Sequence, residues 1–305
     1  MKLSQLGEFG LIERISSHEA KRPDTLVGIG DDAAVISQKS KVKSQNYTLV
    51  TTDALIENVH FKRAGLSFFK LGQKALAANI SDIAAMGGWP THALVTVGLP
   101  ATLNVEQIEE FYRGLDHLAK KYQIDIIGGD TVSSPKELFI SITLLGEVEK
   151  ENLLLRSTAK PGDLICVTGK FGGPASENYS TRCQVPGTRC QVARAIAKAK
   201  LATAMIDSSD GLVRSVLEIC KASKVGARLF EDCVPRAKGA TLDQALYGGE
   251  EYELVFTVPK TKIKKLKVKM IIVGEVMSSG FGVKLIDKHD KIKPLKSGGY
   301  EHFIQ

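Results

Sequence analysis

Several aspartates of this chain stand next to apolar runs, where a charged side chain is unusual. They lie at the ends of expected strands or on a helix rich in small residues. The set comprises Asp31 and Asp32 in GIGDDAAVI, Asp53 in LVTTDAL, Asp82 in ANISDIAAMGG, Asp130 in IIGGDTVSS, and Asp207 and Asp210 in AMIDSSDGL. A carboxylate in such surroundings is partly removed from water and needs a partner of opposite charge. Because these segments hold almost no lysine or arginine, we expect hard cations, rather than salt bridges, to supply that charge.

Carboxylate oxygens suit Mg²⁺, which keeps several waters and often bridges protein carboxylates to the phosphates of a substrate. This many carboxylates exceed what one ion uses, so we expect several Mg²⁺ ions. The ordinary alternative for a single aspartate is a turn or a helix cap, and Asp130 and Asp207 could each be one. Glycine pairs such as Gly128-Gly129 let the backbone approach a ligand, which also fits phosphate. Together these residues predict a magnesium-dependent reaction of phosphate groups.

Other known site patterns fit less well. GIGDDA matches the dinucleotide-binding pattern G-x-G-x-x-A, and Asp53 follows at a spacing that resembles a ribose-binding acid. However, Asp31 and Asp32 would repel a pyrophosphate, and residues 34–46 lack the apolar period of a helix that could receive it. The sequence has no G-x-x-x-x-G-K-[ST] loop and no G-x-S-x-G elbow. A glycosidase with two carboxylates is not excluded by counting aspartates, but it would not need glycine-rich phosphate loops.

The composition is that of a folded chain. Its 305 residues are 43% hydrophobic and 25% charged, enough for two domains or one large domain. No run approaches the ~18 apolar residues of a membrane span, and MKLSQLGEFGLIERI at the start has no signal-peptide core. The five cysteines form no Cys-x-x-Cys pair, so we expect neither a zinc site nor a disulfide framework. We therefore expect a cytoplasmic protein without a membrane partner.

The net charge of +7 comes almost entirely from one segment. Residues 259–270, PKTKIKKLKVKM, hold six lysines and no acidic residue. Aromatic residues make up 6% of the chain and none lies in this segment, whereas nucleic-acid binders usually spread basic groups and interleave them with aromatics. We interpret the segment as a solvated face and expect no nucleic-acid partner, with contact to nucleic acid or an acidic surface as the alternative.

Apolar runs predict strands around these aspartates, and 3.6-residue periods predict helices. The expected strands are residues 47–51, 93–99, 125–127, 138–145, 164–168, 253–258 and 271–276. The expected helices are residues 69–86, 105–122 and 208–223. Because strands and helices mix without strict alternation, we expect a mixed α/β (or α+β) fold. A charged turn followed by Pro161-Gly162 predicts two domains, residues 1–150 and 151–305, with a ligand site between them.

Nine motifs that follow one another along the chain resemble a known family. They are GEFGLI, GIGDDAAV, TTDALIENVHF, KALAANISDIAAMGGWP, IIGGDT, RSTAKPGDLICVTG, IDSSDGL, GGEEYELVFTV and GGYEHF. In this order they resemble the thiamine-monophosphate kinase family, within the superfamily of aminoimidazole-ribonucleotide and selenophosphate synthetases. The resemblance extends from about Gly7 to Phe303. It implies the two-domain architecture of aminoimidazole-ribonucleotide synthetase, in which an N-terminal mixed-sheet domain binds ATP and Mg²⁺ and dimerises, and a C-terminal α/β domain follows.

The resemblance also implies a reaction and its site residues. ATP would give its γ-phosphoryl group to thiamine monophosphate, yielding thiamine diphosphate and ADP, in a homodimer whose site lies between the domains. The implied Mg²⁺ ligands are Asp32, Thr51, Thr52, Asp53, Asp82, Asp130, Asp207 and Asp210. The implied ATP contacts are Gly129, Asp130, Arg156, Ser209 and Tyr112, and the implied thiamine phosphate contacts are His60, Glu250 and Tyr300. No dedicated catalytic base is expected, because the acceptor phosphate is already ionised at neutral pH.

Three departures from the family pattern bear on these expectations. Residues 171–204 look short and unlike the family, and they include Cys183 and Cys190. Ser297 stands where a hydrophobic or aromatic residue is expected, and Ser208 stands where the family often has an apolar one. The alternatives are therefore another ATP-dependent synthetase of the superfamily, for which a reactive Cys-Lys pair or a C-terminal Cys would be expected, or a non-catalytic nucleotide-binding paralogue.

Overall fold

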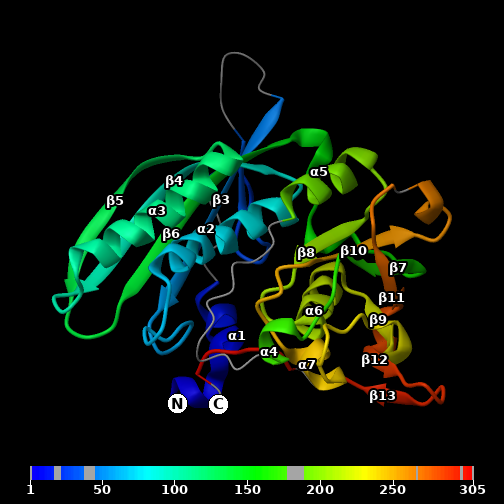
Figure 1. The fold of residues 1–305 in the computed structure, drawn as a ribbon. Coiled ribbons are helices and arrows are strands. Elements are labelled where there is room, and N and C mark those ends of the chain that lie inside the picture. The colour runs from blue at the N-terminus through cyan, green and yellow to red at the C-terminus, as the bar shows by residue number, and fades with distance from the viewer. Residues whose placement is uncertain are drawn as a thin grey trace.

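The computed structural model describes residues 2–16, 22–37, 45–176, 189–265, 267–295 and 298–303. In these ranges the chain forms two β-sheets with helices between and around them (Figure 1). All strands before residue 150 belong to the first sheet and all later strands to the second. The mixed α/β fold expected from the sequence is confirmed.

The first sheet has six strands in the order β1-β2-β3-β6-β4-β5. These strands are β1 (Thr25–Val27), β2 (Ala34–Ser37), β3 (Asn46–Ile56), β4 (Trp89–Pro100), β5 (Asp125–Ser134) and β6 (Phe139–Glu149). Helices α2 (Phe68–Ala85) and α3 (Val105–Tyr122) bury one face of the sheet. Along β4 the side chains alternate, so that Val95 and Val97 are buried while Leu94, just before them, is 38% exposed. The opposite face of the sheet therefore carries exposed side chains.

The second sheet has seven strands in the order β13-β12-β9-β11-β7-β10-β8. They are β7 (Asp163–Val167), β8 (Ala204–Asp207), β9 (Gly226–Phe230), β10 (Leu254–Pro259), β11 (Ile271–Met277), β12 (Val283–Ile286) and β13 (Ile292–Pro294). Helices α6 (Leu212–Ser223) and α7 (Leu242–Tyr247) pack on one face and share an apolar core with it. In strand β10, which lies between β7 and β8, the residues 254–258 are all buried, which means that both faces of this sheet are covered there.

One apolar core extends from the first sheet to the second. Ile80 of α2, Ile196 of helix α5 (Cys190–Ala199) and Phe256 of β10 belong to the same buried cluster. Figure 1 shows α2 and α5 between the two sheets. The chain thus passes from the first sheet to the second near residue 150, while this apolar core continues across that point. The division into domains 1–150 and 151–305 stays a prediction.

The remaining elements connect these layers. They are α1 (Leu3–Ile15), α4 (Gly173–Ser176) and the short 3₁₀ helices η1 (Lys150–Asn152), η2 (Arg156–Thr158), η3 (Glu231–Cys233), η4 (Ile263–Lys265) and η5 (Ser279–Phe281). Helix α1 is kinked at the buried Gly7, whose φ of 73° is a left-handed conformation that favours glycine. The backbone N–H of His302 donates to Glu8 at 3.0 Å, so the two ends of the chain lie side by side (Figure 1).

The expected strands and helices are found, with some boundaries moved. The helix expected at 208–223 begins only at Leu212, because the residues before it form a turn. The strand expected at 125–127 continues to Ser134, so Gly129 and Asp130 lie in a strand and not in a loop. Gly129 is required there, since a Cβ atom would lie 1.8 Å from the carbonyl oxygen of Val95. Likewise Asp53 lies inside β3 and not at its end.

GIGDDA leads into strand β2, so no helix follows it that could bind a pyrophosphate. In the lysine-rich segment 259–270, the lysines are all exposed while Ile263, Val268 and Met270 pack against the core. This amphipathic arrangement agrees with the interpretation of a solvated face. In the described ranges no helix is both long and apolar enough to cross a membrane.

Candidate active site

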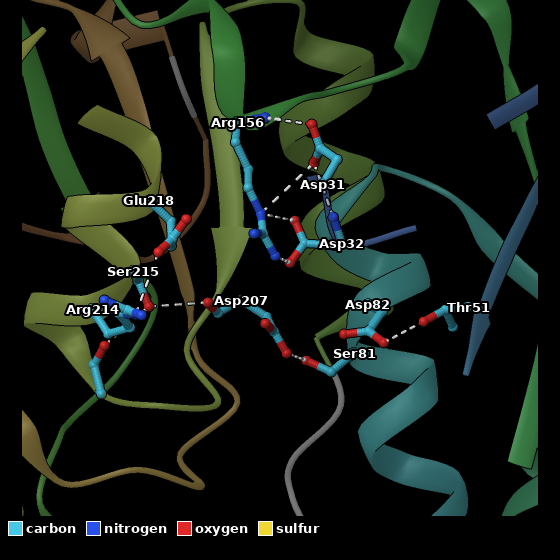
Figure 2. Close-up of polar contacts among 11 residues, drawn as sticks. Asp31, Asp32, Thr51, Ser81, Asp82, Arg156, Asp207, Arg214, Ser215 and Glu218 are labelled. Carbon is cyan, nitrogen blue, oxygen red and sulfur yellow. Dashed lines mark hydrogen bonds and ion pairs between the residues drawn. The ribbon is translucent and has the colours of Figure 1, made fainter. Parts of the chain in front are cut away.

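Three carboxylates from three separate elements meet between the sheets. Asp32 lies just before β2, Asp82 lies on α2 and Asp207 is the last residue of β8. One oxygen atom from each lies within 4.8 Å of the others, and Asp32 and Asp207 are buried (Figure 2). Carboxylates this close cannot all stay ionised without a cation between them. We refer to Asp32, Asp82 and Asp207 as the carboxylate cluster.

Hydroxyl groups from neighbouring elements hold the cluster in place. Thr51 of β3 donates to Asp82 at 2.6 Å, and Ser81 of α2 donates to Asp207 at 2.6 Å. Figure 2 shows the contact of Thr51 with Asp82 and that of Ser81 with Asp207. Because Asp82 and Asp207 each use one carboxylate oxygen for such a contact, the other oxygen of each is available to a ligand.

Burial and mutual repulsion raise the pKa values of these acids. Burial, and then the neighbouring Asp32, raise the pKa of Asp207 to about 8. Burial, followed by the charges of Asp53 and Asp207, raises the pKa of Asp82 well above its usual range. Burial also raises the pKa of Asp53 to about 6. A set of oxygen donors that repel one another in this way fits a hard divalent cation such as Mg²⁺.

Strand β3 brings Thr51 and Asp53 to the side of the cluster, but not Thr52. Thr51 and Asp53 point toward α2, where the side chain of Asn79 accepts from the backbone N–H of Asp53 at 3.1 Å. Thr52 lies between them and points to the opposite face of the sheet. There it is exposed, and its hydroxyl donates to the carbonyl oxygen of Ile142 at 3.1 Å.

Arg156 forms an ion pair with the cluster. Its Nε and Nη2 atoms donate to the two carboxylate oxygens of Asp32 at 3.2 and 2.7 Å. Its backbone N–H donates to Asp31 at 3.2 Å (Figure 2). Although burial opposes the charged form, the charge of Asp32 raises the pKa of Arg156. The expectation that salt bridges play almost no part was therefore wrong for Asp31 and Asp32, because an arginine distant in sequence folds against them.

Two cavities meet beside the cluster. The first has a volume of about 830 Å³ and is lined by residues that include Asp53, His60, Asp210, Glu250 and Tyr300. The second has a volume of about 720 Å³ and is lined by residues that include Gly30, Asp31, Arg156, Asp207 and Arg214. Ser209 and Asp210 line both, so the turn after β8 lies between the cavities. Burial, and then the charge of Glu8, raise the pKa of Asp210 to about 6.

The three residues predicted to contact thiamine phosphate all line the first cavity. The Nδ1 atom of His60 accepts the backbone N–H of Ile56 at 3.0 Å, and burial lowers the pKa of His60. Glu250 pairs with Lys74 of α2 at 2.5 Å, and the hydroxyl of Tyr300 lies 3.3 Å from Nδ1 of His302.

The sequence analysis missed Glu8, Lys74 and His302. Lys74 is 3% exposed on α2, and a lysine directly before the apolar, alanine-rich run 75–78 was a signal that could have been used. Glu8 and His302 stand near opposite ends of the chain, and nothing in their local sequence indicates that they meet.

Besides Thr52, three predicted Mg²⁺ or ATP contacts are not brought to the cluster by this chain. Asp130 and Gly129 lie on the edge strand β5, and the register runs from Asp130 through β4 and β6 to Ala54 of β3. Three inter-strand spacings amount to about 14 Å. Tyr112 lies on α3, partly buried against the apolar core, with its ring 5.4 Å from that of Phe111.

Some predicted features lie outside the described residues, namely Ser297, Cys183 and the other residues of 177–188 within the unusual segment. The described part of that segment includes the buried Phe171 and helix α5. Ser208 is fully buried, and its hydroxyl has no hydrogen-bond partner among the described residues.

Comparisons with known proteins agree with this architecture. The AIR synthase related protein N-terminal domain matches residues 30–148, and the corresponding C-terminal domain matches residues 160–285. The thiamine-monophosphate kinase of Bacillus subtilis (strain 168) is 36% identical over 333 aligned positions, which cover 98% of this chain and 100% of that protein. That of Aquifex aeolicus (strain VF5) is 32% identical and covers 99% and 100%.

A solved structure of AaThiL complexed with AMPPCP and TMP superposes with a TM-score of 0.85 at 31% identity, covering 99% of both chains. The 333 positions aligned with the Bacillus protein exceed the 305 residues of this chain, so this chain lacks internal residues that its relative has. On these matches the chain belongs to the thiamine-monophosphate kinase family, within the AIR synthase related proteins.

Proposed function

We propose that this protein transfers the γ-phosphoryl group of ATP to the phosphate of thiamine monophosphate, producing thiamine diphosphate and ADP. The observation that carries the proposal is the carboxylate cluster beside two adjoining cavities. The family supplies the substrates, since its curated members are named for this activity and a related structure holds AMPPCP and TMP. These matches do not favour another synthetase or a non-catalytic paralogue.

The residues proposed to hold Mg²⁺ are those of the cluster with Asp53, Asp210 and Thr51 beside it. Their oxygen donors and raised pKa values fit several such ions. Mg²⁺ bound there would offset the negative charges of donor and acceptor phosphates, which otherwise repel each other.

We assign the nucleotide to the second cavity and thiamine monophosphate to the first. Arg156 and Ser209 line the second cavity, and a guanidinium suits phosphate oxygens because it donates in pairs. Arg156 would then exchange its contact with Asp32 for one with the nucleotide. The turn at Ser209 and Asp210 would hold the two phosphate groups close and aligned, which is the main task in phosphoryl transfer.

The first cavity positions its substrate without a catalytic base. His60 accepts at Nδ1, so its neutral ring carries the proton on Nε2 and can donate there. Glu250 and Tyr300 line the same wall. The acceptor phosphate needs no deprotonation, because its oxygens are ionised near neutral pH.

We propose further that the protein is a homodimer in which the partner supplies Gly129 and Asp130 to the site. The distance of about 14 Å between Asp130 and β3 supports this. So does the exposure of apolar side chains on β4 and β5, where Leu94, Ile127 and Val132 are 38, 58 and 47% exposed. A two-fold interface would bury this patch on both copies and bring each β5 toward the other copy's site.

We also propose a reducing, cytoplasmic setting. Cys166, Cys190, Cys220 and Cys233 are free thiols, and the first three are buried. ATP as a co-substrate fits the same compartment.

The test is a chromatographic assay for thiamine diphosphate, with ADP measured by a coupled reaction, in Mg²⁺ and in EDTA. We expect product only with Mg²⁺, and Asp207→Asn should lower kcat/KM about a hundredfold or more because a ligand charge is lost. Asp116→Asn, on the exposed side of α3, is the matched control and should leave the rate unchanged. Folded wild-type protein that makes no thiamine diphosphate would contradict the proposal.

A further inference from the structure

Glu8 of α1 is a carboxylate in the wall of the first cavity, and it forms no ion pair with the residues that the structure describes. The other acids lining that cavity are Asp53, Asp210 and Glu250. Asp53 and Asp210 are proposed Mg²⁺ ligands, and Glu250 is paired with Lys74 at 2.5 Å. Glu8 makes no ion pair in the described part of the chain, and its Oε2 atom accepts only the backbone N–H of His302, at 3.0 Å.

Aromatic side chains line the same cavity as this carboxylate. The ring of His302 lies 4.9 Å from that of Tyr300 and 5.2 Å from that of His60, measured between centroids. All three rings line the first cavity together with Phe303, and its described lining holds no lysine or arginine. Aromatic faces beside a carboxylate are the surroundings that a flat organic cation prefers.

The fold presents Glu8 to the cavity through contacts of both chain ends. The left-handed Gly7 turns the backbone just before Glu8. Phe9 then stacks on Arg214 of α6, with the guanidinium carbon 3.1 Å from the ring centroid. From the other end of the chain, the backbone N–H of Tyr300 donates to the carbonyl oxygen of Asp210 at 3.3 Å. These contacts fix the position of Glu8 without pairing its carboxylate with a cation.

We propose that Glu8 recognises the positive charge of the thiazolium ring and is a specificity-determining residue for thiamine monophosphate. This inference rests on the proposed function. The substrate has an anionic phosphate at one end and a permanently cationic ring near the other. The first cavity offers both kinds of partner, because the proposed Mg²⁺ ligands Asp53 and Asp210 line it together with Glu8 and the aromatic rings.

The test compares thiamine monophosphate with an analogue in which an uncharged thiophene replaces the thiazolium ring. Their dissociation constants are measured by calorimetry with Mg²⁺ for the wild type, Glu8→Gln and Glu109→Gln. Glutamine can still accept from His302, so this variant removes only the charge. We expect the wild type to prefer the cation by about tenfold, and Glu8→Gln to lose most of that preference while binding the neutral analogue as before. Glu109 is exposed on α3, so its variant should behave as wild type.

Two results would overturn the inference. If Glu8→Gln weakened both ligands equally, Glu8 would only hold the C-terminal residues in place. If the variant kept the full preference for the cation, its charge would play no part. In either case thiamine diphosphate formation by the wild type, measured separately, would leave the proposed function standing. Wild-type protein that neither binds thiamine monophosphate nor forms product would overturn both.

Discussion

The acids of the site differ from surface acids in the pH range over which they ionise. Burial with the charge of Asp32 raises the pKa of Asp207 to about 8, and burial raises that of Asp53 to about 6. A carboxyl whose pKa is higher in the folded than in the unfolded chain favours folding only while it is protonated. That contribution is complete below about pH 4 and is lost as the pH rises through the folded value.

Without divalent cations the protein should therefore become less stable as the pH rises from 5.5 to 8.5. We expect the melting temperature in EDTA to fall by roughly 5 °C over this range. Mg²⁺ should reduce the fall, because it binds the ionised carboxylates of the folded state. Differential scanning calorimetry measures both series, and Asp207→Asn should flatten the EDTA series. A melting temperature in EDTA that rises with pH would refute the assignment of raised pKa values.

Ser208 offers a second prediction for a single residue. Its buried hydroxyl has no hydrogen-bond partner in the described ranges of the chain, so Ser208→Ala removes a polar group that is unsatisfied there. We expect the free energy of unfolding to stay the same or rise by about 1 kcal/mol in urea titrations. Ser215→Ala is the control, since that hydroxyl donates to the carbonyl oxygens of Asp207 and Gly211 at 3.1 Å. Its loss should cost about 1 kcal/mol, and equal effects of the two changes would contradict the prediction.

At the scale of elements, an ion pair joins α2 to the loop that follows α7. The Lys74 side chain is 4% exposed and that of Glu250 is 24% exposed. Lys74 also donates to the backbone carbonyl of His60 at 3.3 Å, so it ties together two walls of the first cavity. Lys74 is the more buried charge, so removing its partner Glu250 should destabilise the protein more than removing Lys74.

We therefore expect Glu250→Gln to destabilise the protein by about 3 kcal/mol and Lys74→Met by less. The double variant should be more stable than the sum of the single changes indicates, by about 1–3 kcal/mol. Urea unfolding of the four proteins completes the cycle. Additive effects would mean that the pair contributes nothing beyond its separate contacts.

At the scale of the whole molecule, one described chain does not assemble all the predicted residues. Asp130 and Thr52 both lie on the face of the first sheet that points away from the helices, as strand alternation and register require. A second copy packed on that face would bring its Asp130 toward β3, while Asp130 of the same chain stays about 14 Å away.

Mixing two inactive variants tests this arrangement. Asp53→Asn and Asp130→Asn should each lose nearly all activity alone. Co-expressed, they should recover roughly a quarter of the wild-type activity, because half of the dimers are mixed and each mixed dimer holds one intact site. Asp53→Asn mixed with Asp207→Asn is the control and should recover nothing, since both residues belong to one chain's site. No recovery in the first mixture would place Asp130 outside the partner's site.

The sequence by itself determined the elements and the chemistry of the site. Helices α2 and α3 and strands β3, β6 and β10 are visible as periodic apolar residues, because each buries one face or is buried entirely. Aspartates beside apolar runs indicated a cation site, and three of them, Asp32, Asp82 and Asp207, form the cluster. These features depend on neighbours close in the chain, which is why they could be predicted.

Only the tertiary structure decided which distant segments meet. The pairing of Arg156 with Asp32, the contact of His302 with Glu8 and the pairing of Lys74 with Glu250 each join parts of the chain far apart in sequence. The distance of Asp130 from β3 follows from the strand order, which no local pattern specifies. Such contacts result from the packing of whole layers, and the energy that selects them is shared by many residues.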